Sequence, residues 1–189
     1  MVSSDIATGQ FSATGPSHWG EPRSREVTWY DPMPTAAAGA TMSGLEVLEA
    51  MMAGTLPPAP IAALFLMRPV EVGDGRVVFE CRPDQSAYNP IGVVHGGLVC
   101  TLADTVAGCA VHSTLGRGVA YTSIDISVNY LRPVTSGSGV LRATGLVTKR
   151  GKRVAFATAE IVDGAGKTVA TAASNCLVMD NRPSDHHPT

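Results

Sequence analysis

Residues 95–114 read HGGLVCTLADTVAGCAVHST, and this stretch decides the fold. After two glycines, apolar side chains recur on nearly every side of a helical projection, which is typical of a helix that is buried all round. We therefore expect a buried helix from Gly96 to about Thr114. Asp104 interrupts the apolar run, and a buried carboxylate costs several kcal/mol unless it is compensated. Such a residue often serves function, although a polar interface would also explain it.

Strands are expected on both sides of this helix. Alternating apolar and polar residues predict one strand at Val77–Cys81 and another from Ser123 to Tyr130. Turn-forming segments then mark three further strands, at about 139–149, 152–163 and 167–179, which we interpret as an antiparallel meander. One buried helix with these strands predicts an α+β fold in which the sheet curls around the helix.

The part of the chain before residue 77 is less regular. Ser43-Gly44-Leu45-Glu46 supplies a capping box for a short amphipathic helix that ends before Pro57-Pro58. Residues 61–67 are apolar and predict either a further helical turn or the start of the first strand. Residues 1–40 lack periodicity and predict a flexible or surface-lying arm.

The domain organisation follows from these segments. We expect a single folded domain at residues 41–180 and a C-terminal tail at 181–189. Hydrophobic residues make up 44% of the chain and charged residues 16%, which favours self-association. The four cysteines form no CxxC pair, so we expect reduced core thiols and no metal site.

Charge and targeting signals exclude several classes of protein. A net charge of −2 provides no basic field for nucleic acid. No run approaches the roughly 18 apolar residues of a membrane span. The start of the sequence lacks the features of a signal peptide. We therefore expect a cytoplasmic protein without nucleic-acid or membrane partners.

The spacing between Gly96 and Asp104 constrains any chemistry that they share. Glycines at a helix N-terminus let a ligand approach unpaired backbone N–H groups, as an oxyanion site needs. Gly96 and Asp104 are eight residues apart, which corresponds to about 12 Å along one helix axis. They cannot flank one reacting carbon. If both serve one reaction, Gly96 of one subunit should face Asp104 of another across a two-fold dimer.

Residues 89–104, NPIGVVHGGLVCTLAD, resemble the signature of hotdog-fold acyl-CoA thioesterases of the phenylacetate-degradation (PaaI-like) type. The likeness extends over about residues 40 to 179. It implies a hotdog fold, a long buried helix wrapped by a curved antiparallel sheet. It also implies hydrolysis of acyl-CoA thioesters to free acid and CoA by a homodimer or homotetramer. CoA is then part of the substrate, and no cofactor or metal is required.

The resemblance also implies roles for catalytic residues. Asp104 matches the nucleophile or general base, and Gly96 matches the backbone donor that polarises the thioester carbonyl. Asn89 and His95 match residues that support that loop and carbonyl. Ser123 matches a hydroxyl that orients the carboxylate or its attacking water. A thioester suits such a site, because its thiolate leaving group needs little help from a general acid.

Binding of the CoA part is expected at a basic turn. Cations gather at residues 149–153, where related enzymes meet the nucleotide, although a charged hairpin tip is often only solvated. Asp125 and Tyr130 lie on a strand that resembles the family's ligand-contacting strand. The expected substrate- or CoA-binding residues are Gly97, Asp125, Tyr130, Arg132, Thr148, Lys149, Arg150, Gly151 and Lys152.

Two other hypotheses remain open. A hotdog dehydratase or hydratase would share the fold, but the spacing from His95-Gly96-Gly97 to Asp104 favours the thioesterase. A non-catalytic acyl-CoA-binding sensor would share the fold and the basic turn but has no need of Asp104. The sequence leaves open the acyl group, the choice between nucleophile and base, the choice between dimer and tetramer, and the role of the arm.

Overall fold

The computed structural model describes residues 16–180, so the start of the predicted arm (1–15) and the predicted tail (181–189) lie outside the described residues. Short 3-10 turns occur at Ser17–Trp19, Gln85–Ala87 and Ser136–Ser138. The helices and strands are, in chain order, α1 (Met33–Ala38), α2 (Gly44–Met52), α3 (Pro60–Leu64), β1 (Met67–Gly73), β2 (Arg76–Cys81), α4 (Gly96–His112), β3 (Val119–Tyr130), β4 (Leu141–Arg150), β5 (Val154–Val162) and β6 (Thr168–Asp180).

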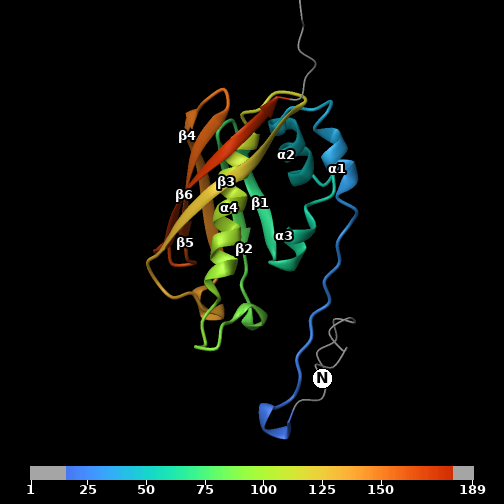
Figure 1. Cartoon of the computed structure of the whole chain (residues 1–189). Helices are drawn as coiled ribbons and strands as arrows, with labels where there is room; N and C mark the ends of the chain where they lie inside the picture. Colours follow the sequence, from blue (N-terminus) through green and yellow to red (C-terminus); the bar gives the residue numbers. More distant parts are fainter. Residues whose placement is uncertain (1–15, 181–189) are drawn as a thin grey trace, which may run out of the picture.

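A single antiparallel sheet wraps around α4 (Figure 1). Its strand order is β1-β2-β4-β5-β6-β3. The predicted meander is confirmed as β4-β5-β6, and the predicted α+β hotdog architecture is confirmed with it. β3 does not continue the meander, because after α4 it crosses to the far edge of the sheet and pairs with β6. The ambiguous segment 61–67 contains the end of α3 and the start of β1.

Small residues let α4 lie close to the sheet. Gly145 of β4 faces α4, and a Cβ atom there would lie 2.0 Å from the carbonyl oxygen of Val106. Ala143, Ala157 and Ala159 around it are also buried. Long side chains from α4, such as Leu102, fill the space between these positions. The close approach gives the densely packed interior that stabilises the domain.

The expectation that α4 is buried all round is wrong along one stripe. Gly97 is exposed, and Thr101, Asp104 and Thr105 are partly exposed. The sheet packs against the opposite side of the helix, and these four residues keep exposed surface. The hydroxyls of Thr101 and Thr105 each donate to the backbone carbonyl four residues earlier. The stripe is therefore the side of α4 open to a ligand or another chain.

The N-terminal helices lie beside β1, with α1 farther from the sheet than α2 (Figure 1). The predicted capping box of α2 is confirmed. The Ser43 hydroxyl accepts from the Glu46 N–H, and the Glu46 carboxylate accepts from the Ser43 N–H. Arg117 pairs with Glu46 at 3.1 Å. The Ser43 backbone contact, followed by that ion pair, holds the pKa of Glu46 below its usual value.

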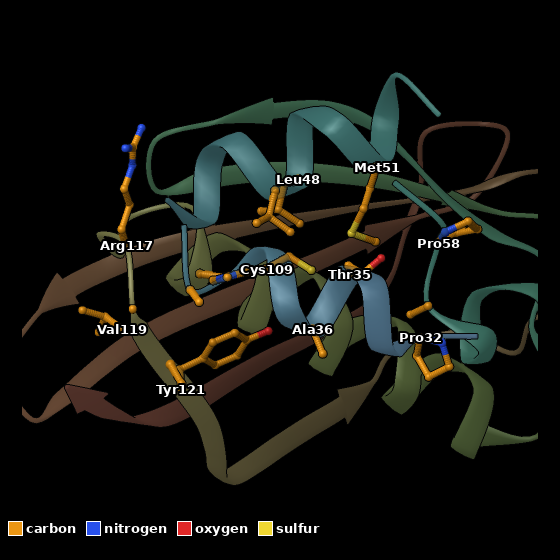
Figure 2. A pocket seen from close by; sticks show the side chains of 17 residues that line it. Pro32, Thr35, Ala36, Leu48, Met51, Pro58, Cys109, Arg117, Val119 and Tyr121 are labelled. Carbon is orange, nitrogen blue, oxygen red and sulfur yellow. The ribbon is translucent and has the colours of Figure 1, made fainter. Parts of the chain in front are cut away.

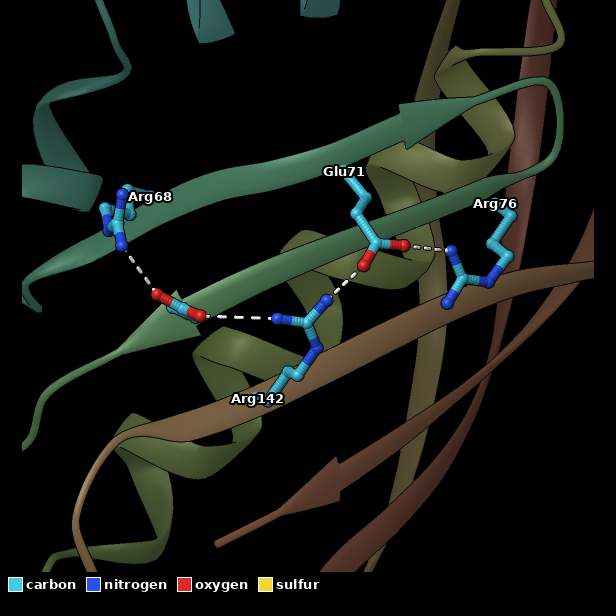
Figure 3. A network of polar contacts seen from close by, with 5 residues as sticks. Arg68, Glu71, Arg76 and Arg142 are labelled. Atoms are coloured by element: carbon cyan, nitrogen blue, oxygen red, sulfur yellow. Dashed lines mark hydrogen bonds and ion pairs between the residues drawn. The ribbon is translucent and has the colours of Figure 1, made fainter. Parts of the chain in front are cut away.

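Five charged side chains form a ladder across the outer face of β1, β2 and β4 (Figure 3). The order of contacts is Arg68, Glu80, Arg142, Glu71 and Arg76. The hydrogen bond from Arg76 is the main cause of a lowered pKa at Glu71. Because these groups are largely solvated, each ion pair adds little to the stability of the fold. We interpret the ladder as a set of contacts that supports the pairing of these three strands.

Among residues 16–180, no helix has both the length and the apolar character that crossing a bilayer requires.

The close approach of α4 to β4 makes Gly145 a sensitive position. Gly145→Ala should lower the free energy of unfolding by about 1–3 kcal/mol, because the added methyl group forces the helix backbone away from the sheet. Urea unfolding monitored by circular dichroism measures the change. Gly116→Ala is the matched control, since no atom lies within 4 Å of a Cβ there. Equal stability of the two variants would contradict this packing.

Candidate active site

Asp104 lies in the middle of α4 on its partly exposed stripe. The hydroxyl of Ser123 donates a hydrogen bond of 2.8 Å to Asp104 Oδ1. A β-bulge between Ser123 and Asp125 shifts the register of β3 against β6 at this point. Bulges re-aim side chains near functional sites. The bulge leaves Ser123 facing the helix. The Ser123 hydroxyl fixes one oxygen of the Asp104 carboxylate, so the other oxygen can face a ligand.

The N-terminus of α4 presents one unused backbone donor. The His95 side chain caps the helix, because its Nδ1 accepts from the Gly97 N–H at 2.8 Å. The His95 carbonyl accepts from the Leu98 N–H. Within residues 16–180, the N–H of Gly96 has no such acceptor. The helix dipole adds partial positive charge, so Gly96 can bind an oxyanion while the N–H of Gly97 is already engaged.

Asn89 holds the loop that leads into this helix. Its side-chain Oδ1 accepts from the N–H groups of Ile91 at 3.1 Å and Val93 at 3.4 Å. Its backbone N–H donates to the carbonyl of Val93 at 2.8 Å. The N–H of His95 donates to the carbonyl of Ala87 at 2.7 Å. Asn89 and His95 therefore hold the loop that leads into α4.

Tyr130, at the end of β3, lies against Gly96. Its hydroxyl donates to the Gly96 carbonyl at 3.1 Å, and its ring would lie 3.1 Å from a Cβ atom at that position. Partial burial is the main cause of its raised pKa. Arg132 lines a cavity of about 360 Å³ beside the same helix end. Both residues belong to the Gly96 end of the molecule and not to the surroundings of Asp104.

Gly96 and Asp104 do not meet within one chain. They lie on one continuous helix, Gly96–His112, and their separation of eight residues keeps them about 12 Å apart along its axis. The predicted donor and the predicted carboxylate therefore occupy separate half-sites. Neither half alone contains all the groups that thioester hydrolysis would need.

The predicted ligand-contacting residues are spread over several surfaces. Asp125 accepts from the side chain of Asn175 at 2.7 Å and lies on the outer face of β3, away from Ser123. The Thr148 hydroxyl donates to the Phe156 carbonyl, and Arg150 pairs with Asp74 at 2.7 Å. The structure therefore does not bring Asp125 to Asp104.

The basic turn lies near the C-terminal end of α4. Gly151 adjoins the Val154 carbonyl at the start of β5, and Lys149 and Lys152 are exposed. Gly75, in the neighbouring β1–β2 turn, lies against both Val147 and Thr114. The turn and Gly96 therefore lie at opposite ends of α4.

A cavity of about 980 Å³ at the C-terminal half of α4 was not predicted (Figure 2). It is enclosed by α1, α2, the C-terminal half of α4 and the start of β3. The ring of Tyr121 packs against Gly108, one turn after Asp104, and lies 5.3 Å from the ring of His112. His112 also lines this cavity. Its lining comes from segments far apart in the sequence, so local patterns could not reveal it.

Three ionisable groups of the cavity wall, His112, Tyr121 and Cys109, are held uncharged. Burial lowers the pKa of His112 and raises the pKa of Tyr121. Burial, aided by the charge of Asp104, raises the pKa of Cys109 to about 12. All three groups are neutral at pH 7. Within residues 16–180, no cluster of His, Cys, Asp or Glu could hold a metal ion.

Comparison with known proteins identifies the family. The profile of the Thioesterase superfamily matches residues 91–170. Human acyl-coenzyme A thioesterase 13 is 33% identical over 102 residues, which cover 53% of this chain and 71% of the human protein. The chain belongs to the thioesterase superfamily. A Caenorhabditis elegans esterase homologue is 34% identical over 117 residues, covering 61% of this chain and 68% of that protein.

Solved structures support the same assignment. The Escherichia coli PaaI protein from the phenylacetic acid degradation operon superposes with a TM-score of 0.60 at 26% identity, covering 64% of this thioesterase and 85% of PaaI. A phenylacetic acid degradation-related protein of Ralstonia eutropha gives a TM-score of 0.64 at 26% identity, covering 69% and 98% of the two chains. The chain is thus a PaaI-like hotdog thioester hydrolase, and about a third of it has no counterpart in the Ralstonia protein.

The hydrogen bond from Ser123 predicts a positioning role. Ser123→Ala should lower kcat for thioester hydrolysis by roughly 10- to 100-fold, because the Asp104 carboxylate loses a charge-assisted hydrogen bond that fixes its direction. KM should change little. Ser123→Thr keeps the hydroxyl and should retain most activity. A kcat for Ser123→Ala equal to that of wild type would contradict the role.

Proposed function

We propose that this thioesterase hydrolyses acyl-CoA thioesters to the free acid and CoA. The observation that carries the proposal is the Asp104 carboxylate on the open side of α4, held by the Ser123 hydroxyl at 2.8 Å. The human relative bears the name acyl-coenzyme A thioesterase. A Streptococcus pneumoniae thioesterase that is 26% identical, with a TM-score of 0.56, was crystallised with coenzyme A. That likeness covers 62% of this chain and 91% of the pneumococcal chain.

In the proposed reaction Asp104 acts as nucleophile or general base. Either its free oxygen attacks the thioester carbon, or it takes a proton from a water molecule that attacks. Negative charge then develops on the carbonyl oxygen, where the Gly96 N–H donates a hydrogen bond. Collapse of the tetrahedral intermediate breaks the C–S bond and expels the CoA thiolate. If an acyl-Asp104 anhydride forms, water hydrolyses it and restores the carboxylate.

We propose that the two half-sites come from two copies of the chain. β3 pairs with β6 on one side only, and Ile124 and Tyr130 on it are 56% and 55% exposed. A long unpaired edge strand favours pairing with another chain. A two-fold axis beside β3 would place α4 of a second copy antiparallel to the first. Gly96 of that copy would then approach Asp104. A dimer of dimers is compatible with the same contact.

The proposed arrangement also unites the candidate CoA-binding groups. Within one chain, Arg132 lies near Gly96 while Lys149 and Lys152 lie at the opposite end of α4. An antiparallel pair of α4 helices would bring the basic turn of one copy toward Gly96 of the other. Because Arg150 pairs with Asp74, we assign phosphate binding to Lys149 and Lys152 rather than to Arg150. Asp125 is left out of this arrangement, because it lies on the outer face of β3.

A non-catalytic acyl-CoA sensor is the second candidate. It would use the same fold and basic turn, but the Ser123–Asp104 hydrogen bond would serve no purpose in it. A hotdog dehydratase is disfavoured, because His95 is engaged as a helix cap at its Nδ1 atom.

The role of Asp104 can be tested by thiol release from a panel of acyl-CoAs. Asp104→Asn should lower kcat by at least about 100-fold on every substrate that wild type hydrolyses, because the amide can neither attack nor accept the proton. Binding of acyl-CoA should persist. Unchanged turnover in Asp104→Asn would refute the mechanism. Tight binding without turnover by wild type would establish the sensor.

The basic turn predicts a defect in binding. Replacement of both Lys149 and Lys152 by Ala should raise KM for acyl-CoA about tenfold at low salt and leave kcat unchanged, because the phosphates lose two cationic partners. The matched control is Lys167→Ala in the β5–β6 turn, which should leave KM as in wild type. Equal KM values for the double variant and the control would exclude the turn from CoA binding.

A further inference from the structure

Two hydrogen bonds hold the α1 region of the predicted N-terminal arm against the domain. The Thr35 hydroxyl donates to the Pro57 carbonyl at 2.8 Å. The Gly39 carbonyl accepts from the Gly118 N–H, at the start of β3, at 2.9 Å. These contacts hold α1 in place as one wall of the cavity of about 980 Å³ (Figure 2). The arm therefore shapes an interior space.

The cavity lies about one turn of α4 beyond the carboxylate of the proposed active site, because Cys109 and Tyr121 line it while Asp104 and Ser123 do not. Tyr121 and Ser123 lie on the same side of β3, and Ser123 bonds to Asp104 while Tyr121 packs on the following turn of α4. Figure 2 shows the Tyr121 hydroxyl directed toward α1. The charge of Asp104 contributes to the raised pKa values of Tyr121 and Cys109, both of which line the cavity. A group attached to a carbonyl carbon at Asp104 would reach this space by passing Tyr121 and Cys109.

The wall chemistry selects an apolar occupant. Val47, Leu48 and Met51 from α2 face small residues of the arm across the cavity. The one guanidinium at the edge, Arg117, is neutralised by Glu46 at 3.1 Å. With His112, Cys109 and Tyr121 uncharged, the described wall offers no free charge to a charged ligand. A volume of this size suits a ligand the size of a drug molecule.

We infer that this cavity receives the acyl group of the substrate, and that Ala36 and Ala40 of the arm limit how long that group can be. The inference rests on the proposed hydrolysis of acyl-CoA. The substrates are then thioesters with an extended apolar acyl chain. The small side chains of the arm leave the space open, because larger residues at these positions would fill it.

Substitution at Ala36 tests the inference through the ratio of kcat/KM for decanoyl-CoA to that for acetyl-CoA. Ala36→Phe should lower this ratio at least about tenfold, since several methylene groups lose their burial while the acetyl group does not reach the arm. The matched control is Ala37→Phe, because Ala37 lies on the same helix but does not line the cavity. An unchanged ratio in Ala36→Phe, or an equal fall in Ala37→Phe, would overturn the inference.

A binding measurement separates this inference from the proposed activity. In an Asp104→Asn background, isothermal titration should show about tenfold weaker binding of decanoyl-CoA after Ala36→Phe and no change for acetyl-CoA. If wild type hydrolyses neither thioester but this difference in binding persists, the proposed activity fails and the acyl cavity stands. If hydrolysis occurs but the Ala36→Phe variant binds decanoyl-CoA as tightly as the protein that keeps Ala36, only the assignment of the cavity to the acyl group fails.

Discussion

The rise of an α-helix is the constraint on which the rest of this structure depends. Gly96 and Asp104 are fixed about 12 Å apart because both belong to α4. The helix is rigid because the sheet packs against it along its length. Gly145 lets the helix backbone reach the sheet, and buried alanines continue that contact. A helix held in this way cannot bend to unite the two groups. The proposed chemistry therefore requires a second copy of the chain.

The same packing leaves two surfaces of a single chain exposed. One is the stripe of α4 that carries Asp104, and the other is the free edge of β3 that carries Ser123. The two surfaces adjoin, because the Ser123 hydroxyl bridges from the strand to the carboxylate. Pairing of β3 edges would cover both at once. Assembly and catalysis would then depend on one contact, and the acyl cavity behind Tyr121 would remain within each subunit.

Much of the fold could be predicted from local pattern. The long apolar run identified α4, turn-forming segments marked the strands of the β4-β5-β6 meander, and the capping box at Ser43 marked the start of α2. Short elements escaped, because six residues of α1 or five of α3 carry too little periodicity. The place of β3 at the far edge depends on pairing with β6, about 50 residues away in sequence. For the site, the sequence predicted which residues take part but not how they are arranged. The hydrogen bond from the Gly97 N–H to His95, for example, depends on side-chain geometry that no sequence pattern contains.

The most direct test of the split site is complementation between two inactive variants. Asp104→Asn removes the carboxylate, and Gly96→Val places a side chain over the oxyanion donor. Co-expressed subunits that pair at random should recover about a quarter of wild-type thioesterase activity, because half of the dimers are mixed and each mixed dimer has one intact site of two. Mixed dimers confirmed by mass spectrometry but no more active than the separate variants would contradict the account.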